Sequence, residues 1–251
     1  QSRTMTTRIQ TEQTMIALVT GAAQRIGKAI TEHLAAKGWD VAIHYNRSNR
    51  EASTLAEKLS HGYPGQRFMI YKADLLCDHE TENLVQAVME TMGFPQLLIN
   101  NASVFDRSTL AQTSTSFFDR QMTVNLKAPF ILMREFINRC GKGMIINMVD
   151  TRISGNREDY AAYTLAKKSL WELTKMAAAA YGPAVRVNAI APGLVLAPEG
   201  KDEQYLRQLA ADIPMKRPGG LKPILDSLDY LLRNEYLTGE LLHCDGGQRL
   251  L

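Results

Sequence analysis

The sequence predicts an α/β protein in which one doubly wound parallel sheet is covered by helices on both faces. Short apolar runs alternate with longer segments of helical periodicity along residues 15–251. The runs are continuously apolar instead of alternating with polar residues, which is typical of parallel strands that are buried on both faces. Strand–helix repeats with right-handed crossovers then give a doubly wound sheet.

Each element is expected from its own stretch of sequence, taken in chain order. The predicted strands are 15–20 "MIALVT", 39–45 "WDVAIHY", 67–73 "RFMIYKA", 96–100 "QLLIN", 143–149 "GMIINMV" and 184–191 "AVRVNAIA", with a short last strand in 240–247. The predicted helices between them are 26–37, 49–60, 79–92, 117–139, 160–181 and 222–232. The proline and glycine residues of 213–220, "IPMKRPGG", predict a loop.

Length and composition indicate one globular domain over residues 15–251, preceded by a flexible extension, residues 1–14. The extension is polar and lacks the apolar core of a signal peptide. No run of about 18 apolar residues suggests a membrane span. A net charge of +3 without a basic stripe argues against nucleic-acid binding.

The cysteines and histidines indicate neither a disulfide framework nor a metal site. Cys77, Cys140 and Cys244 form no CxxC pair, and their odd number favours a reduced, cytoplasmic setting. The histidines are scattered without metal-ligand spacing, so we expect no metal.

The stretch "TGAAQRIG", residues 20–27, lies between the first strand and the first helix and is typical of a phosphate-binding turn. Helix N-terminal amides and the helix dipole attract a phosphate group there. Gly21 and Gly27 stand at expected places, whereas Arg25 occupies a position where glycine is usual. The alternative is a glycine-containing turn without a ligand.

The end of the second strand, "HYNRS", indicates which dinucleotide would bind. An NAD site usually has an acidic residue here. This chain has His44, Asn46, Arg47 and Ser48 instead, and Arg47 can bind a 2′-phosphate. We therefore expect NADPH, with a solvated surface arginine as the alternative. Asp74, after the third strand, can accept a hydrogen bond from the adenine amino group or cap its own loop.

Tyr163 and Lys167 form the candidate catalytic pair. Their i, i+4 spacing in "YTLAK" places both on one face of a helix. An ammonium near a phenol is expected to lower the pKa of the phenol and to make it a better proton donor or acceptor near neutrality. YxxxK alone is a weak signal, but here it follows the glycine turn, "NNAS" at 100–103 and a strand that ends in "NMVD".

With these motifs the chain resembles the short-chain dehydrogenase/reductase family over essentially all of residues 15–251. Asn125 in "VNLKAPF" and "APG" at 191–193 add to the resemblance. In that family a serine lies about 13 residues before the tyrosine, where this chain has Asp150. The departures at Arg25 and Asp150 both match one branch, the pteridine reductases and the related dihydromonapterin reductases.

The resemblance implies a Rossmann-like domain that reduces a dihydropterin to its tetrahydro form with NADPH. It implies these catalytic residues: Asp150, Tyr163, Lys167 and Asn125, the last holding a water in a proton relay. It implies these cofactor residues: Gly21, Arg25, Ile26, Gly27, His44, Asn46, Arg47, Ser48, Asp74, Leu75, Asn101, Ala102, Tyr163, Lys167, Pro192 and Gly193. The implied substrate residues are Arg25, Ser103, Phe105, Asp150, Tyr163 and Leu194, under a mobile loop and helix within 191–214.

The chemistry of a pterin gives the two departures a reason. A dihydropterin carries a C=N bond that takes hydride at carbon when a nitrogen is protonated, and a carboxyl group suits a ring nitrogen better than a serine hydroxyl does. Asp150 is otherwise an N-cap or loop carboxylate, and Phe105, expected to cover one face of the pterin, is otherwise core. Arg25 would reach both the cofactor phosphates and the pterin, or lie over the first helix as a surface arginine.

Two other functions are consistent with the same motifs. One is a carbonyl reductase of the 3-oxoacyl-thioester type, against which Asp150 argues. The other is a non-catalytic NADPH-binding sensor, which has no need of Asn125, Tyr163 and Lys167. A homotetramer is expected by resemblance, with helices 117–139 and 160–181 paired across a two-fold axis and the C-terminal "DGGQRLL", including Arg249, at a second interface.

Overall fold

The predicted parallel sheet is present, with seven strands. The computed structural model describes residues 14–197 and 200–251, so the extension expected at 1–14 lies outside the described residues apart from Thr14. The strand order is β3-β2-β1-β4-β5-β6-β7, with every neighbouring pair parallel. The strands are β1 Ile16–Val19, β2 Asp40–Tyr45, β3 Phe68–Lys72, β4 Leu97–Asn100, β5 Gly143–Met148, β6 Val185–Pro192 and β7 Leu241–Cys244.

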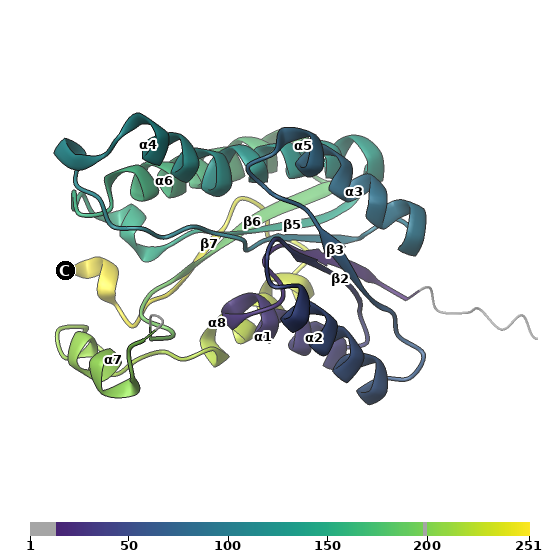
Figure 1. Ribbon diagram of the computed structural model, residues 1–251, viewed down its shortest axis with the longest axis horizontal. Coiled ribbons are helices and arrows are strands. Elements are labelled where there is room, and N and C mark those ends of the chain that lie inside the picture. Colours follow the sequence, from purple (N-terminus) through teal and green to yellow (C-terminus); the bar gives the residue numbers. More distant parts are fainter. Residues whose placement is uncertain (1–13, 198–199) are drawn as a thin grey trace, which may run out of the picture.

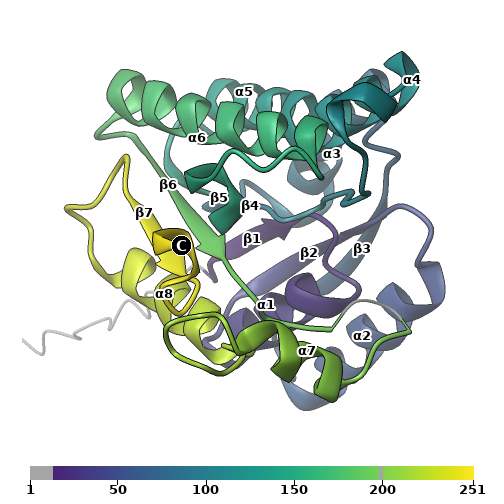
Figure 2. The ribbon, with the colours of Figure 1, turned by 90° about the vertical axis from the view of Figure 1, so that its left-hand side faces the viewer.

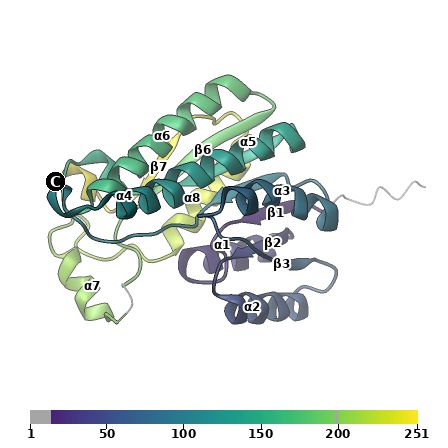
Figure 3. The ribbon, with the colours of Figure 1, turned by 45° about the horizontal axis from the view of Figure 1, so that its top comes forward.

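Helices cover both faces of this sheet, as the continuous apolar strands predict (Figure 1). One face carries α3 Asp78–Met92, α4 Thr115–Met122, α5 Ala128–Cys140 and α6 Ala161–Tyr181, which lie side by side in Figure 3. The other carries α1 Arg25–Ala36, α2 Asn49–Gly62 and α8 Lys222–Arg233. The predicted helices therefore exist, and their ends differ from the expected ones by a few residues.

Alternation along each strand divides the core into two apolar layers. In β1, Ala17 and Val19 pack with α1, α2 and α8, whereas Ile16 and Leu18 pack with α3 and α5. All four side chains are at most 5% exposed, because β1 has a strand on each side and helices above and below. This is why the first strand contains no polar residue.

The site is positioned by the reversal of strand order at β1. From β1 the chain builds outward through β2 and β3, and then returns to place β4 on the other side of β1. Ligands of such sheets bind outside the carboxyl ends of the strands at this reversal. The turn after β1 and the turn after β4 consequently lie side by side, joined by the Thr20 amide, which donates to the Ile99 carbonyl at 3.0 Å.

The helical segment predicted at 117–139 is not one regular helix. α4 ends at Met122, a π-helical turn follows at Thr123–Lys127, and α5 begins at Ala128. The extra residue of a π turn often marks a functional position, and Asn125 lies in this one. Apolar periodicity alone does not distinguish such a turn from continuous α-helix.

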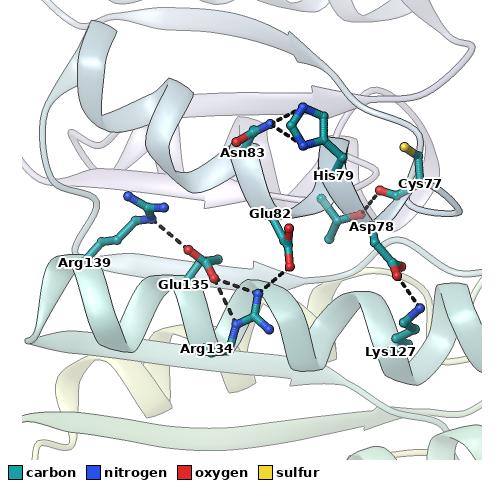
Figure 4. Close-up of polar contacts among 10 residues, drawn as sticks. Cys77, Asp78, His79, Glu82, Asn83, Lys127, Arg134, Glu135 and Arg139 are labelled. Carbon is teal, nitrogen blue, oxygen red and sulfur yellow. Dashed lines mark hydrogen bonds and ion pairs between the residues drawn. The ribbon is translucent and has the colours of Figure 1, made fainter.

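Ion pairs between α3 and α5 hold this segment in place (Figure 4). Lys127 pairs with Asp78, and Arg134 bridges Glu82 to Glu135, whose second oxygen accepts from Arg139 at 2.8 Å. Burial would raise the pKa of Glu135, but the two guanidinium groups outweigh it and hold that pKa below its ordinary value. The end of the π turn is thus anchored to a neighbouring helix.

The segment expected to cover the substrate contains a helix. β6 continues to Pro192, and α7 occupies Glu203–Ala210, while residues 198–199 lie outside the described range. Figures 1 and 2 place α7 and the C-terminal turn at the same end of the molecule. The loop predicted at 213–220 is confirmed. Among the described helices, none has the length and apolarity needed to cross a bilayer.

An apolar strip lies on the outer side of α5 and α6. Phe130 and Met176 are exposed there and line one groove between the two helices. Pairing of these helices between subunits would cover the strip, which is consistent with the expected tetramer. The oligomeric state stays a prediction.

A single methyl group at Gly27 should break the turn after β1. A Cβ there would lie 2.1 Å from the Gly21 carbonyl oxygen and 2.6 Å from Asn101 Nδ2. We expect Gly27→Ala to lower the free energy of unfolding by about 3 kcal/mol or more, measured by urea denaturation. Gly62→Ala is the control, because nothing lies near its Cβ position and stability should stay the same or rise slightly. Equal stability of both variants would contradict this account of the turn.

Candidate active site

The turn after β1 is held by a buried histidine from β2. The Gly21 amide, in a backbone with φ +60°, donates to His44 Nδ1 at 3.0 Å. Nε2 of His44 therefore carries the proton and donates to the Ala73 carbonyl at 3.1 Å. Burial lowers the pKa of His44 to about 4, although the Ala73 carbonyl and the Asp74 charge act in the opposite direction. His44, predicted to bind the cofactor, thus acts as a neutral link between three strands.

A second clamp joins this turn to the turn after β4. Asn101 Nδ2 donates to the carbonyl oxygens of Thr20 at 2.9 Å and Gly21 at 3.2 Å. Thr20 Oγ1 accepts from the amides of Asn101 and Ala102, both at 3.0 Å. Asn101 and Ala102, also predicted as cofactor residues, therefore fix the shape of the glycine turn.

Arg25 adopts the backbone that explains why glycine is usual at its position. Its φ is +51°, in the left-handed region that disfavours residues with a Cβ. Its Nη2 donates to the carbonyl of Ala197 at 3.1 Å, so it connects the glycine turn to the segment after β6. No side chain caps the first turn of α1, which leaves its amides available to an anion.

These two turns border one cleft of about 740 Å³. Its lining includes the expected cofactor residues Gly21, Arg25, Ile26, Gly27, His44, Asn46, Arg47, Ser48, Asp74, Leu75, Asn101 and Ala102, together with Ser103 and Phe105. Arg47 is exposed at its edge. Asp74 accepts from Asn46 Nδ2 at 3.1 Å and from the Leu76 amide at 3.0 Å, so it caps its own loop as well as facing the cleft. The structure therefore brings these predicted residues together, whereas Tyr163, Lys167, Pro192 and Gly193 do not line this cleft.

Tyr163 and Asp150 are in direct contact. The phenol of Tyr163 donates to Asp150 Oδ2 at 2.9 Å, from the first turn of α6 to the end of β5. Asp150 Oδ1 accepts from the Arg152 amide at 2.8 Å, and Asp150 thereby caps the short helix Thr151–Ser154. The N-cap considered for Asp150 is therefore present on one oxygen, the other oxygen contacts the phenol, and the role of Asp150 in proton transfer stays a prediction.

Lys167 lies one helical turn beyond Tyr163 and is 2% exposed. Its ammonium donates to the Met148 carbonyl at 2.8 Å and lies 5.8 Å from the centroid of the Tyr163 ring. Burial lowers the pKa of Lys167 to about 8, with the charge of Asp150 acting in the opposite direction. The effect of burial on the pKa of Lys167 is therefore larger than the effect of the nearby Asp150 charge.

The expected lowering of the Tyr163 pKa is wrong for this arrangement. Burial raises the pKa of Tyr163 well above its ordinary value, and the charge and hydrogen bond of Asp150 raise it further. Burial also raises the pKa of Asp150, against the Arg152 amide and the Tyr163 phenol. Tyr163 is thus held as a neutral phenol, which is the form that can donate a proton.

Asn125 fixes the turn that follows "NNAS". Its Oδ1 accepts from Ser103 Oγ at 2.7 Å and from the Val104 amide at 3.3 Å. Its Nδ2 donates to the Val104 carbonyl at 2.9 Å and to Gln121 Oε1 at 3.1 Å. Asn125 is fully buried, so the structure gives it a positioning contact with Ser103. Its predicted role in a water relay stays a prediction.

Phe105 lies at the mouth of the site. It contacts Tyr160 and Arg152, two residues that the sequence analysis did not single out. Its ring stacks on Tyr160 with centroids 4.3 Å apart and meets the Tyr163 ring edge-on at 4.7 Å. The guanidinium of Arg152 lies 4.5 Å from the Tyr160 centroid and 5.3 Å from that of Phe105. We call Phe105, Arg152 and Tyr160 the mouth cluster. No spacing rule in the sequence would have found it.

The remaining predicted residues lie where β6 meets β7. The Gly193 amide donates to the Cys244 carbonyl at 3.0 Å, and a Cβ on Gly193 would lie 2.7 Å from Asp245 Cα. Pro192 ends β6, and the Leu194 carbonyl accepts from the Gly219 amide. Glycine is therefore required at 193 for close approach of the chain.

Asp245 joins this junction to the catalytic turn. It is 5% exposed and accepts from Thr151 Oγ1 at 2.6 Å and from Arg249 Nη1 at 2.8 Å. Arg249, expected near a subunit interface, is thus paired within its own chain. Across residues 14–197 and 200–251, no three His, Cys, Asp or Glu side chains gather in a way that would hold a metal ion.

Comparisons with known proteins identify the family. A family model described as Enoyl-(Acyl carrier protein) reductase matches residues 21–249. A short-chain type dehydrogenase/reductase of Picea abies is 30% identical over 93% of this chain and 92% of its own length. Pteridine reductase 1 of Leishmania tarentolae is 30% identical over 94% of this chain and 96% of its own length.

Two further similarities bear on the substrate. Alternative dihydrofolate reductase 1 (FolM) of Brucella suis, solved in complex with NADP, superposes with a TM-score of 0.86 at 34% identity, covering 94% of this chain and 96% of its own. A 3-oxoacyl-[acyl-carrier-protein] reductase of Staphylococcus epidermidis is 28% identical over 92% of this chain and 97% of its own length.

The buried ammonium of Lys167 predicts an alkaline gain in stability. Because its pKa is about 8 when folded and 10.5 as the ordinary value, the unfolded chain binds more protons between these values, and stability rises with pH. Between pH 7.5 and 9.5 the free energy of unfolding should rise by about 2 kcal/mol relative to Lys167→Met. Urea denaturation of both proteins across this range measures the difference. A difference that does not change with pH would contradict the assignment.

Proposed function

This chain belongs to the short-chain dehydrogenase/reductase family, and from that premise we propose that it reduces a dihydropterin to the tetrahydro form with NADPH. The observation that carries the proposal is the hydrogen bond from the Tyr163 phenol to Asp150 Oδ2 at 2.9 Å. A carboxyl group touches the proton donor at the position where the family usually has a serine. The similarity to a pteridine reductase supports the same class of substrate.

The cleft fits a phosphorylated dinucleotide. Bound NADPH would supply the hydride. The uncapped first turn of α1 offers amides to its pyrophosphate, and Arg47 offers a guanidinium to its 2′-phosphate. Asn46, Arg47 and Ser48 put no carboxylate at the end of β2, where an NAD site usually has one that would repel a 2′-phosphate. The NADP in the Brucella suis structure supports this choice of cofactor.

The proton is delivered by Tyr163. Hydride adds to the carbon of the pterin C=N bond, and the nitrogen of that bond takes the phenol proton. Asp150, whose pKa is raised by burial, carries a proton for this step, gives it to the phenolate across the 2.9 Å contact that joins them, and takes up a new proton from solvent. Lys167 holds its charge near this pair and limits the cost of the transient phenolate.

The pterin ring is placed by the same residues. In this proposal Phe105 covers one face of the ring, because its side chain is exposed and lies 4.7 Å from the Tyr163 ring. Ser103 is held by Asn125 Oδ1 with its oxygen still able to accept from the pterin edge. Arg25 connects the glycine turn to Ala197, at the start of the covering segment.

A carbonyl reductase acting on 3-oxoacyl thioesters is the second candidate, favoured by similarity to the Staphylococcus epidermidis enzyme. A carbonyl oxygen needs a hydrogen-bond donor beside the tyrosine, which serine supplies. An ionised Asp150 would repel the developing oxyanion, so this candidate requires Asp150 to stay protonated throughout.

The choice between them is tested by replacing Asp150. NADPH oxidation is measured with a dihydropterin and with an acetoacetyl thioester for the parent, Asp150→Ser and Tyr163→Phe. We expect pterin turnover by the parent, at least a tenfold lower kcat in Asp150→Ser from loss of proton return, and near-complete loss in Tyr163→Phe. Tyr236→Phe, at a fully solvated ring, is the control. Turnover of the thioester without the pterin would overturn the proposal.

Cofactor preference should depend on Arg47. Removing a charged hydrogen bond to a phosphate costs about 1.5–3 kcal/mol, so Arg47→Ala should raise the Michaelis constant for NADPH roughly 10- to 100-fold. The constant for NADH should change little. Arg233→Ala, at another exposed arginine, controls for the loss of one positive charge. An unchanged ratio of the two constants would place 2′-phosphate recognition elsewhere.

A further inference from the structure

The mouth cluster contains a cation whose hydrogen-bonding edge is unused. The guanidinium of Arg152 is held by the faces of Tyr160 and Phe105, at 4.5 Å and 5.3 Å from their centroids. A guanidinium carries five N–H donors in its own plane, and contact with aromatic rings uses none of their hydrogen-bonding capacity. Within residues 14–197 and 200–251, no acceptor or carboxylate lies within bonding distance of that guanidinium, and Arg152 donates only through its amide to Asp150.

Three other arginines at this end of the sheet are paired with carboxylates. Arg120 binds Asp106, Arg157 binds Asp159, and Arg249 binds Asp245. The charge of Arg152 also acts on Asp150, although no hydrogen bond or ion pair joins the two side chains. The N–H donors of the Arg152 guanidinium therefore have no direct partner among residues 14–197 and 200–251.

The cluster is built into the fold. The Ser108 amide donates to the Asp159 carbonyl at 3.1 Å, and the Ala161 amide donates back to Ser108 at 3.4 Å. These bonds tie the loop of Phe105 to the segment of Tyr160, so the ring stack that supports Arg152 has a fixed base. The cation is thus held in one place, which lowers the entropy cost of binding a ligand.

The position relative to the reacting atoms indicates what the ligand is. Arg152 lies two residues from Asp150, and the Phe105 ring is 4.7 Å from that of Tyr163. A substrate whose ring lies against Tyr163 can extend its substituent past this cluster, where Phe105 is exposed. We propose that the mouth cluster is a subsite for an anionic group, a carboxylate or a phosphate, carried on the substituent of the substrate, with Arg152 as its ligand.

This inference rests on the proposed function and narrows it to pterins with a negatively charged substituent. A bidentate guanidinium contact suits both carboxylate and phosphate. A neutral hydroxylated substituent would gain much less binding affinity from a contact with Arg152. Selectivity among substrates should therefore lie in KM. Burial raises the pKa of Asp150 and Tyr163 and the charge of Arg152 acts against it, but this effect is the same for every substrate.

The test compares three dihydropterins at saturating NADPH: dihydrofolate with its carboxylates, a phosphorylated dihydroneopterin, and the neutral dihydrobiopterin. Arg152→Gln should lower kcat/KM for whichever anionic substrate the parent prefers about 10- to 100-fold more than for dihydrobiopterin, and the difference should lie mainly in KM. Arg152→Lys should be intermediate. Arg157→Gln, five residues along the chain at an exposed arginine, should match the parent.

Two results would overturn the subsite. One is an equal loss with all three substrates, because Arg152 would then act through Asp150, Tyr163 or the fold. The other is no loss with any of them. Higher salt should raise KM for the preferred anionic substrate alone, and equal salt effects on all three would also count against it.

A binding measurement separates this proposal from the proposed function. p-Aminobenzoylglutamate, which carries the carboxylates without a pterin, is titrated calorimetrically into the parent and Arg152→Gln in the presence of NADP, with inorganic phosphate in a second series. Binding of either probe that weakens about tenfold or more in the variant supports the subsite, even if no pterin is reduced and the proposed function fails. Absence of any dependence on Arg152 for both probes overturns it.

Discussion

The whole site depends on the contact between the turns that follow β1 and β4. Asn101 donates to the backbone of the glycine turn, Thr20 receives the amides of Asn101 and Ala102, and Gly27 packs where no side chain would fit. This contact exists because the strand order reverses at β1 and brings β4 beside it. The cofactor cleft and the approach to Tyr163 both begin at this pair of turns.

Three buried ionisable groups make up the other half of the site, and burial disfavours the charged form of each. Burial raises the pKa of Asp150 and of Tyr163 and lowers that of Lys167, so each group is pushed toward its neutral form. A buried charge is costly, and a trio with pKa values moved in this way is typical of functional sites. The 2.9 Å bond between Tyr163 and Asp150 gives the proton a path inside this apolar surrounding.

Much of the fold could be predicted because its signals are local. Continuous apolar strands, glycine turns and strand–helix alternation predict a parallel sheet. In such a sheet the carboxyl ends of the strands lie together, and this places Gly21, Arg47, Asp74 and Asn101 in one cleft. The Tyr163–Lys167 pair is likewise visible as a helical spacing. These features depend on near neighbours in the chain or on a topology with few alternatives.

What could not be predicted depends on contacts between distant segments. The direction in which the pKa of Tyr163 shifts depends on burial and on which atom Lys167 contacts. The spacing of the two residues in the sequence predicts neither. The π turn around Asn125 reflects packing of α4 and α5 on the core, which periodicity does not record. Arg152 and Tyr160 meet Phe105 only because the loop after β4 is bonded to the segment before α6.

The departures from the usual family pattern have a common physical consequence. Arg25 accepts a left-handed backbone, at a cost of roughly 1 kcal/mol that glycine would avoid, and in return contacts the segment after β6. Asp150 brings a second carboxyl group into an apolar site, and Thr151 beside it is fixed by Asp245 from the C-terminal end of the sheet. Each residue is locally unfavourable and is held by a distant segment, so the site is stable only when β6, β7 and the C-terminal turn are in place. Glycine at position 25 would avoid the left-handed strain, and serine at position 150 would avoid a buried carboxyl group. Fold stability therefore explains neither charged residue, whereas the proposed pterin substrate gives both a reason.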